Sequence, residues 1–478
     1  MNFSGLIRIL PRITIIMASG LAICIIIAII YKEPFLPFLI TILISVFLSL
    51  ISFFLSKKIV LKDLTKKEAY FSVSASWLLI ALLGMIPYSL SGFFPSFVDA
   101  FFESVSGFTT TGSSILTDIE KLPKSILFWR SLTHWIGGIG IIVLVIVVMP
   151  AMKINNYSIF YLESSLREKI HPRIRSVGFR LLGVYIALTI VEVVFLQIGN
   201  MNLFESVCHA FGSVSTGGFS PKNTSIGGYS PYIQYVITVF MFLGGTNFIL
   251  HYYAFQGQFT KIKDNDEFRF YIKVIVIAGL VIAAILYYGS ERSIELSIRE
   301  SFFQVVSIVT CTGFATTDYL LWPGIAGMIM FLLMFFGGST GSTAGGIKMA
   351  RHLIAIKALK NRFSYEIHSN SVFAIHLNHK IVNQNDLSSI FVFIYWYMLA
   401  FVTGSIVLIF LGLDIMTAAS SIATAMGGIG PGFGTVGPNS NFAHLPDTVK
   451  IVISFFMILG RLEIYPVLIL FSPGYWKK

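Results

Sequence analysis

Long runs of apolar residues dominate this chain, and polar positions gather in the short segments between them. About ten runs contain 18 or more residues, enough to cross a hydrocarbon core of about 30 Å as a helix. The chain is therefore predicted to be an all-α polytopic membrane protein with ten transmembrane helices. The predicted spans are 13–31, 35–56, 68–92, 127–150, 178–199, 231–255, 271–289, 322–347, 387–412 and 448–472.

The start of the chain also resembles a secretory signal peptide, because its first apolar run follows Arg8 and Arg12. No Ala-x-Ala-like cleavage site comes after that run, and a second run begins at Phe35. We therefore predict that the first helix is retained in the mature protein.

Composition supports a membrane protein and argues against an enzyme. The chain is 55% hydrophobic and 12% charged, whereas a soluble domain is roughly 25% charged. Its three cysteines, Cys24, Cys208 and Cys311, are too few for a disulfide framework or a thiolate metal site. No constellation of a nucleophile or metal ligands is visible, so we expect no enzymatic activity and no organic cofactor.

The net charge of +11 is distributed unevenly. If the N-terminus is cytoplasmic, most lysines and arginines fall in inner segments, and the outer segments carry more acids than bases. The positive-inside rule then places both termini in the cytoplasm. The basic inner segments Lys57–Lys67, Lys153–Arg180 and Lys348–Arg362 either only anchor this topology or also dock a cytosolic partner. No segment resembles a nucleic-acid groove. The acidic outer face either enriches cations or merely reflects bases drawn inward.

Internal repetition is the most informative feature of the sequence. Four semi-polar segments each predict a short helix followed by small residues and a glycine. They are Asp99–Gly112, Phe204–Gly217, Glu300–Gly313 and Thr417–Gly430. A second repeated motif, centred on Gly-Gly or Gly-Arg, follows each of them, at Trp135–Ile139, Phe242–Thr246, Phe335–Ser339 and Ile458–Leu462. We predict a leading helix pair and four units of helix, re-entrant segment and helix. The predicted boundaries are 1–67, 68–152, 153–257, 258–362 and 363–478.

Re-entrant backbone at membrane depth is tolerated only where it lines a polar cavity. Four equivalent units in one chain can surround one axis with fourfold pseudo-symmetry, so that their glycine-ended strands converge. Rings of carbonyl oxygens can replace the hydration shell of an alkali cation, and the negative C-terminal ends of the short helices add to this attraction. A cation selectivity filter is therefore predicted. Its candidate residues are Thr110, Thr111, Gly112, Thr216, Gly217, Thr312, Gly313, Ile429 and Gly430.

Several motifs resemble the Trk/Ktr/HKT superfamily of cation transporters, specifically bacterial Trk-type potassium uptake membrane subunits. The motifs are FFESVSGFTTTG at Phe101–Gly112, STGGFS at Ser215–Ser220, TCTGFATT at Thr310–Thr317, GIGPGFG at Gly428–Gly434, GGSTGSTAGGIK at Gly337–Lys348 and GRLEI at Gly460–Ile464. The resemblance implies one filter glycine per unit, at Gly112, Gly217, Gly313 and Gly430, and potassium as the transported ion. It also implies a homodimer in the inner membrane, with a TrkA-like cytosolic nucleotide-binding regulatory subunit against the inner loops.

Two features of the sequence predict a gate. Arg461 lies midway along the last span, where the first three units carry Gly138, Gly245 and Gly338. A charge at that depth normally faces a cavity or a partner, so Arg461 either opposes cations in the pore or pairs with Glu463 or Glu192. The stretch Gly337–Gly346 breaks the eighth span and predicts an intramembrane gating loop, or else a face for tight helix packing. The candidate gate residues are Arg461, Gly337, Gly338, Ser339, Gly341, Gly345 and Gly346.

The leading hypothesis is a channel-like potassium uptake subunit. The alternative is a proton- or sodium-coupled secondary transporter, for which inverted repeats and intramembrane titratable groups are typical. Glu192, in the middle of a span, is the candidate proton relay for that alternative. His376 and His379 have a possible ligand spacing, but a loop histidine pair without acidic neighbours is typical of solvated side chains.

Overall fold

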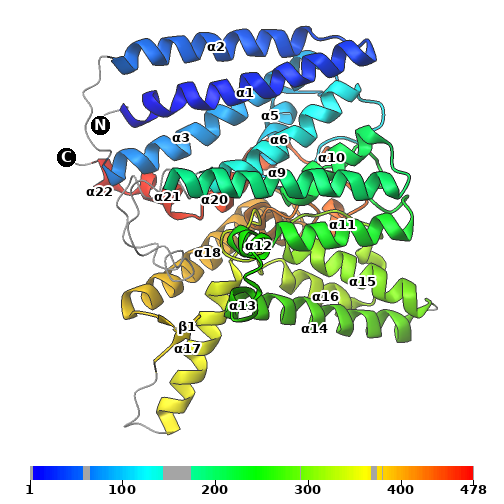
Figure 1. The fold of residues 1–478 in the computed structure, drawn as a ribbon, viewed down its shortest axis with the longest axis vertical. Helices are drawn as coiled ribbons and strands as arrows, with labels where there is room; N and C mark the ends of the chain where they lie inside the picture. The colour runs from blue at the N-terminus through cyan, green and yellow to red at the C-terminus, as the bar shows by residue number, and fades with distance from the viewer. Residues whose placement is uncertain are drawn as a thin grey trace.

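The structure is a computed structural model that describes residues 4–57, 65–143, 174–290, 292–367, 374–378 and 380–476. It is helical apart from one hairpin of two short antiparallel strands. Figure 1 shows the long helices lying side by side, with α17 projecting from this bundle at a steep angle. The elements are α1 (Ser4–Tyr31), α2 (Leu36–Lys57), α3 (Lys66–Gly84), α4 (Ile86–Ser91), α5 (Phe97–Phe108), α6 (Lys124–Val143), α9 (Ile174–Ile198), α10 (Leu203–Val214), α11 (Pro231–Gly244), α12 (Phe248–Phe255), α13 (Phe259–Lys263), α14 (Asp266–Gly289), α15 (Ile294–Val309), η3 (Tyr319–Leu321), α16 (Gly324–Leu333), α17 (Met349–Ile367), β1 (His376–Leu377), β2 (Lys380–Ile381), α18 (Gln384–Phe410), α19 (Ile415–Gly427), η4 (Gly434–Val436), α20 (Asp447–Arg461), α21 (Tyr465–Leu468), η5 (Ile469–Phe471) and α22 (Pro473–Trp476).

Six helical stretches in the described part of the chain are long and apolar enough to cross a membrane. They are Gly5–Tyr31, Leu36–Ser56, Lys67–Ser91, Gly178–Ile198, Asp266–Gly289 and Gln384–Phe410. Two further pairs pass the same test together but are bent, by 103° between α11 and α12 and by 117° between α20 and the residues after it. These eight correspond to predicted spans. Of the other two, 127–150 runs from α6 into residues outside the described ranges, and 322–347 breaks after Leu333 at the end of α16.

Four short helices, α5, α10, α15 and α19, begin in the same way. Each accepts a hydrogen bond from the backbone N–H of its third residue through the N-cap side chain, which is Ser96, Asn202, Ser293 or Asp414. Such a cap satisfies one of the N–H groups that a helix start leaves unpaired. The capping residues therefore mark the starts of the predicted re-entrant segments.

Packing between elements follows the predicted order of units. Each short helix contacts the helix before it and the helix after it, as α5 does with α3 and α6. The second helix of one unit also contacts the short helix of the next, in the pairs α6 with α10, α11 with α15, and α20 with α5. The last of these pairs joins the fourth unit to the first. Three of the four junctions between successive units are therefore made by such a helix contact, including the junction of the fourth unit with the first.

The leading helix pair packs on the first unit. α1 contacts α2, α3 and α6, and the turn between α1 and α2 contributes Glu33. Its carboxylate accepts hydrogen bonds from the backbone N–H groups of Lys124 and Ser125, at 2.7 and 2.8 Å. Since an acid at a helix start satisfies unpaired N–H groups and complements the helix dipole, Glu33 fixes the pair to the start of α6.

Candidate cation pathway

The backbone after each short helix repeats one unusual conformation. A residue with positive φ is followed, two positions later, by a glycine with positive φ in all four units. The first residues are Thr110 (53°), Thr216 (53°), Cys311 (59°) and Gly428 (70°), and the glycines are Gly112 (82°), Gly218 (82°), Gly313 (82°) and Gly430 (96°). Left-handed conformations in threonine and cysteine are costly and persist only where the surroundings fix them. We call residues 110–112, 216–218, 311–313 and 428–430 the four glycine strands.

The second glycine strand corrects one predicted position. The sequence alignment equated Gly217 with Gly112, but the backbone conformation places Gly218 in the equivalent position. Two adjacent glycines made the sequence ambiguous, and the shared Thr-Gly ending favoured the first of them. The following residue was the better guide, because Gly218 precedes Phe219 as Gly313 precedes Phe314.

Each of the four glycines lies directly against the backbone of the next strand. A Cβ atom at Gly112 would overlap the carbonyl oxygen of Gly217. The same relation recurs around the whole set, with Gly218 against Thr312 O, Gly313 against Ile429 O, and Gly430 against Thr111 O. Any side chain at these positions would push two strands apart. The contacts close on themselves, so the four glycine strands form a ring.

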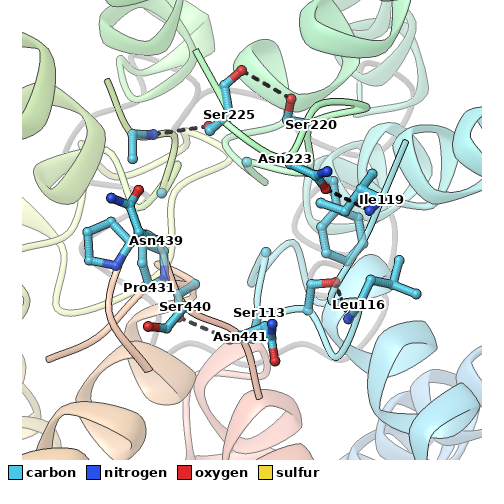
Figure 2. A pocket seen from close by; sticks show the side chains of 18 of the residues that line it. Ser113, Leu116, Ile119, Ser220, Asn223, Ser225, Pro431, Asn439, Ser440 and Asn441 are labelled. Atoms are coloured by element: carbon cyan, nitrogen blue, oxygen red, sulfur yellow. Dashed lines mark hydrogen bonds between the residues drawn. The ribbon is translucent and has the colours of Figure 1, made fainter. Parts of the chain in front are cut away.

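A cavity of about 210 Å³ opens on one side of this ring. All four ring glycines line it, together with hydroxyl and amide side chains such as Ser113, Ser220 and Asn439. Figure 2 shows labelled side chains from three separate segments around the open centre. We call this the glycine cavity. Its wall is rich in oxygen atoms without formal charge, which suits a partly hydrated cation.

Two acids of α5 are paired with bases. Asp99 accepts from Lys450 Nζ at 2.6 Å, and Glu103 accepts from Arg130 Nε at 2.8 Å. Among the described residues that line the glycine cavity, the charged ones are Arg130 and Lys222. None of the described residues that line the cavity is a carboxylate, so its neutral polar groups are backbone carbonyls, hydroxyls and amides.

On the other side of the ring, residues 337–348 form a closed loop. Its two ends are joined by a parallel bridge between Phe336 and Ile347, with a hydrogen bond from Gly337 N to Ile347 O of 2.8 Å. Thr343, near the tip, donates to the carbonyls of Val214 and Gly244 at 3.1 Å each. Thr343 also accepts from Thr216 Oγ1 at 3.2 Å. The loop is therefore in contact with the second glycine strand.

Arg461 joins this loop to the first unit. Its Nη1 donates to Thr343 O and its Nη2 to Gly137 O, both at 2.8 Å, and its side chain is buried. The alternative pairing with Glu463 is wrong, because that carboxylate binds Arg351 at 2.6 Å. Arg461 Nε has no hydrogen-bond partner within the described structure.

Comparison with known proteins identifies the chain. Residues 37–478 match the TrkH family model, described as cation transport protein. The chain belongs to the TrkH family. It is 32% identical to the Trk system potassium uptake protein TrkI of Halomonas elongata, over all of this chain and 98% of that protein. It is also 32% identical to TrkH of Escherichia coli, over 87% of each chain. The crystal structure of the potassium transporter TrkH from Vibrio parahaemolyticus superposes with a TM-score of 0.90, at 29% identity and full coverage of both chains.

In this TrkH family member, sequence reasoning missed one residue that anchors the loop. Glu267, at the start of α14, is buried, and its Oε1 accepts from Thr340 N at 2.7 Å, Thr340 Oγ1 at 3.0 Å and Ala350 N at 2.9 Å. It thereby binds both the loop and the start of α17. Acids are common in the first turn of any helix, so its position in the sequence did not distinguish it.

The remaining sequence candidates lie away from the ring. Glu192, on α9, is fully buried, and neither carboxylate oxygen has a hydrogen-bond partner in the described ranges. His376 lies in β1 and is exposed, whereas His379 lies outside the described residues. Within the part of the chain that the structure describes, no group of three potential metal-binding side chains occurs.

Proposed function

We propose that this TrkH family member takes up potassium across the inner membrane through a backbone-carbonyl filter formed by the four glycine strands. One observation carries the proposal: each ring glycine contacts the carbonyl of the next strand, and the series closes. The names of its relatives, which are potassium uptake proteins, agree with it. The proposed architecture has ten transmembrane helices and, in addition, four re-entrant pore helices, arranged with fourfold pseudo-symmetry around one pore and with both termini in the cytoplasm.

The filter works by replacing water around the ion. The carbonyl oxygens of Thr111, Gly217, Thr312 and Ile429, each next to a ring glycine, would face a dehydrated cation as a ring of dipoles. The short helices end immediately before the strands, so their partially negative C-termini favour a cation there. Thr110, Thr216, Gly112, Gly313 and Gly430 belong to the same strands, and Gly218 joins the predicted set.

The gate consists of the loop 337–348 and Arg461. Arg461 brings a positive charge to the inner side of the ring and hydrogen-bonds the loop through Thr343 O. Movement of Gly337, Gly338, Ser339, Gly341, Gly345 and Gly346 would open or block the path. The basic helix α17 follows the loop directly, so a TrkA-like nucleotide-binding subunit bound there would pull on it. A homodimer with one pore in each protomer is part of this proposal.

Rubidium uptake into liposomes that contain only this chain tests the filter. Wild-type protein is expected to take up rubidium, with potassium competing far better than sodium. Gly112→Ser places a side chain against Gly217 O, so we expect sodium to compete about tenfold better, the equivalent of about 1.4 kcal/mol. Gly92, which has positive φ but open space around it, provides the control Gly92→Ser. An unchanged ratio in Gly112→Ser would contradict the filter.

One observation favours a second candidate, a proton-coupled secondary transporter. The carboxylate of Glu192 is buried without a hydrogen-bond partner among the described residues, and acids within membrane spans mark proton relays in pumps and transporters. In that case a pH gradient alone would drive rubidium accumulation, and Glu192→Gln would abolish it. If uptake follows only the membrane potential and the rubidium gradient, the proton-coupled mechanism is rejected and the channel-like mechanism is supported.

A further inference from the structure

One buried ion pair lies beside the ring and is not needed to form it. Arg130 on α6 and Glu103 on α5 are 1% and 0% exposed and are joined at 2.8 Å. Glu103 also accepts from Ser114 Oγ at 2.9 Å and from Ile115 N at 3.0 Å. Arg130 donates to Ser114 Oγ at 3.2 Å and to Ser220 O at 3.3 Å. The pair therefore holds the segments that leave the first and second glycine strands.

The same guanidinium also contacts the residue next to a ring glycine. Arg130 lies over the ring of Phe219, 4.1 Å from its centroid. His134, one helical turn further along α6, stacks on Phe219 at 4.0 Å and accepts its backbone N–H at 3.3 Å. Phe219 directly follows Gly218, so two side chains of the first unit fix the backbone of the second strand.

Comparison of the four units shows that this arrangement belongs to the first unit alone. Nine residues before the ring glycines the short helices carry Glu103, His209, Gln304 and Ser421. In the segment after each short helix, the repeated motif contains an equivalent glycine, which is Gly137, Gly244, Gly337 or Gly460. Seven residues before this glycine stand Arg130, Ile237, Met330 and Ile453, respectively. Three residues before the same glycine stand His134, Met241, Met334 and Met457, respectively. The other three units carry apolar residues at the position of Arg130 and polar residues other than acids at the position of Glu103, so the acid–base pair belongs to the first unit.

A buried ion pair is weak evidence for stability, because apolar residues of similar volume often serve as well. The other three units carry Ile237, Met330 and Ile453 at the position of Arg130, so the fold accepts an apolar residue there. The hydrogen bonds to Ser114 and Ser220 instead suit a role in fixing the spacing of the first two glycine strands. A carbonyl ring excludes the smaller sodium ion only if it does not contract around it.

We propose that Arg130 and Glu103 are specificity-determining positioning residues, which hold the first two glycine strands apart and so keep the ring selective for potassium over sodium. This inference rests on the proposed filter. Neither side chain needs to contact the ion. The pair acts by fixing Ser114, Ser220 and Phe219, whose backbone continues directly from the ring.

The test uses the full-length chain in liposomes and measures how well sodium and potassium each compete with rubidium uptake. The central variant is the double substitution Glu103→Gln with Arg130→Met, which reproduces the Gln304 and Met330 of the third unit. It leaves no unpaired buried charge, so it is expected to fold where the single Arg130→Met fails. The matched control is Ile237→Met, at the equivalent buried position of α11. Gly112→Ser reports on the filter itself.

The double variant is expected to let sodium compete about tenfold better, comparable to the loss of one hydrogen bond to a charged group. A purely structural role would lower uptake of both ions together and leave their ratio unchanged. A wild-type ratio in the double variant, with a relaxed ratio in Gly112→Ser, would overturn this inference and leave the filter intact. An equal change in Ile237→Met would also overturn it. Wild-type ratios in both the double variant and Gly112→Ser would reject the filter proposal as well.

Discussion

Replacement of Arg461 by alanine gives the sharpest prediction about the gate. The guanidinium donates at 2.8 Å to Thr343 O in the loop and to Gly137 O in the first unit. Alanine removes both bonds and also the positive charge on the inner side of the ring. Both changes favour passage of potassium, because the loop loses a restraint and the cation loses a repulsive neighbour.

The structure sets the size of the effect. Each hydrogen bond to a charged group contributes about 1.5 kcal/mol or more, so loss of two weakens the closed loop by about 3 kcal/mol. That corresponds to a shift of more than about 100-fold toward the open loop. Since Arg461 Nε already lacks a partner in the described structure, we expect an increase in rubidium flux nearer to tenfold.

The assay is rubidium uptake into liposomes without a cytosolic partner, normalised to the amount of folded protein. Arg461→Lys separates the two contributions, because lysine keeps the charge but presents a compact ammonium instead of a two-pronged donor. If the charge dominates, the lysine variant stays near wild type; if the loop restraint dominates, its flux rises toward that of alanine. Flux at or below the wild-type level in Arg461→Ala would refute the barrier.

Two further predictions follow from the contacts around the ring and the leading pair. Glu267→Ala removes the acceptor for Thr340 and Ala350, so rubidium flux without a cytosolic partner should rise several-fold. Glu366→Ala, at an exposed position on α17, is the control. Unchanged flux in Glu267→Ala would remove Glu267 from the gate. Glu33→Ala leaves two N–H groups at the start of α6 without their acceptor. The melting temperature in detergent should therefore fall, reflecting a loss of about 1 kcal/mol of folding stability, while sodium and potassium compete with rubidium uptake as in wild type. An unaltered melting temperature would contradict the anchoring role of Glu33.

Eight of the ten helical spans and the four short helices that end in glycine strands could be predicted because both depend on local sequence. Apolar length indicates a span wherever it occurs, and a short capped helix followed by glycine recurs four times. The position of the second ring glycine was predicted one residue too early, at Gly217 instead of Gly218. Either glycine permits a positive φ, and the structure distinguishes them by the φ of 82° at Gly218 and by its contact with Thr312 O.

Pairing between distant segments could not be predicted. Asp99 and Lys450 are joined although 351 positions separate them, and Glu103 pairs with Arg130 in another helix. These partners depend on how helices pack, which no spacing in the sequence encodes. The glycine-rich loop was predicted as a helix break, but its anchorage by Glu267 depends on a residue 73 positions away.

The central claim is that the four glycine strands bind a dehydrated potassium ion on a common axis. Anomalous diffraction from crystals soaked in rubidium or thallium tests it most directly. The account predicts a peak surrounded by Gly112, Gly218, Gly313 and Gly430, which potassium displaces and sodium at equal concentration does not. An ordered ring without such a peak, or strands found apart from one another, would contradict it.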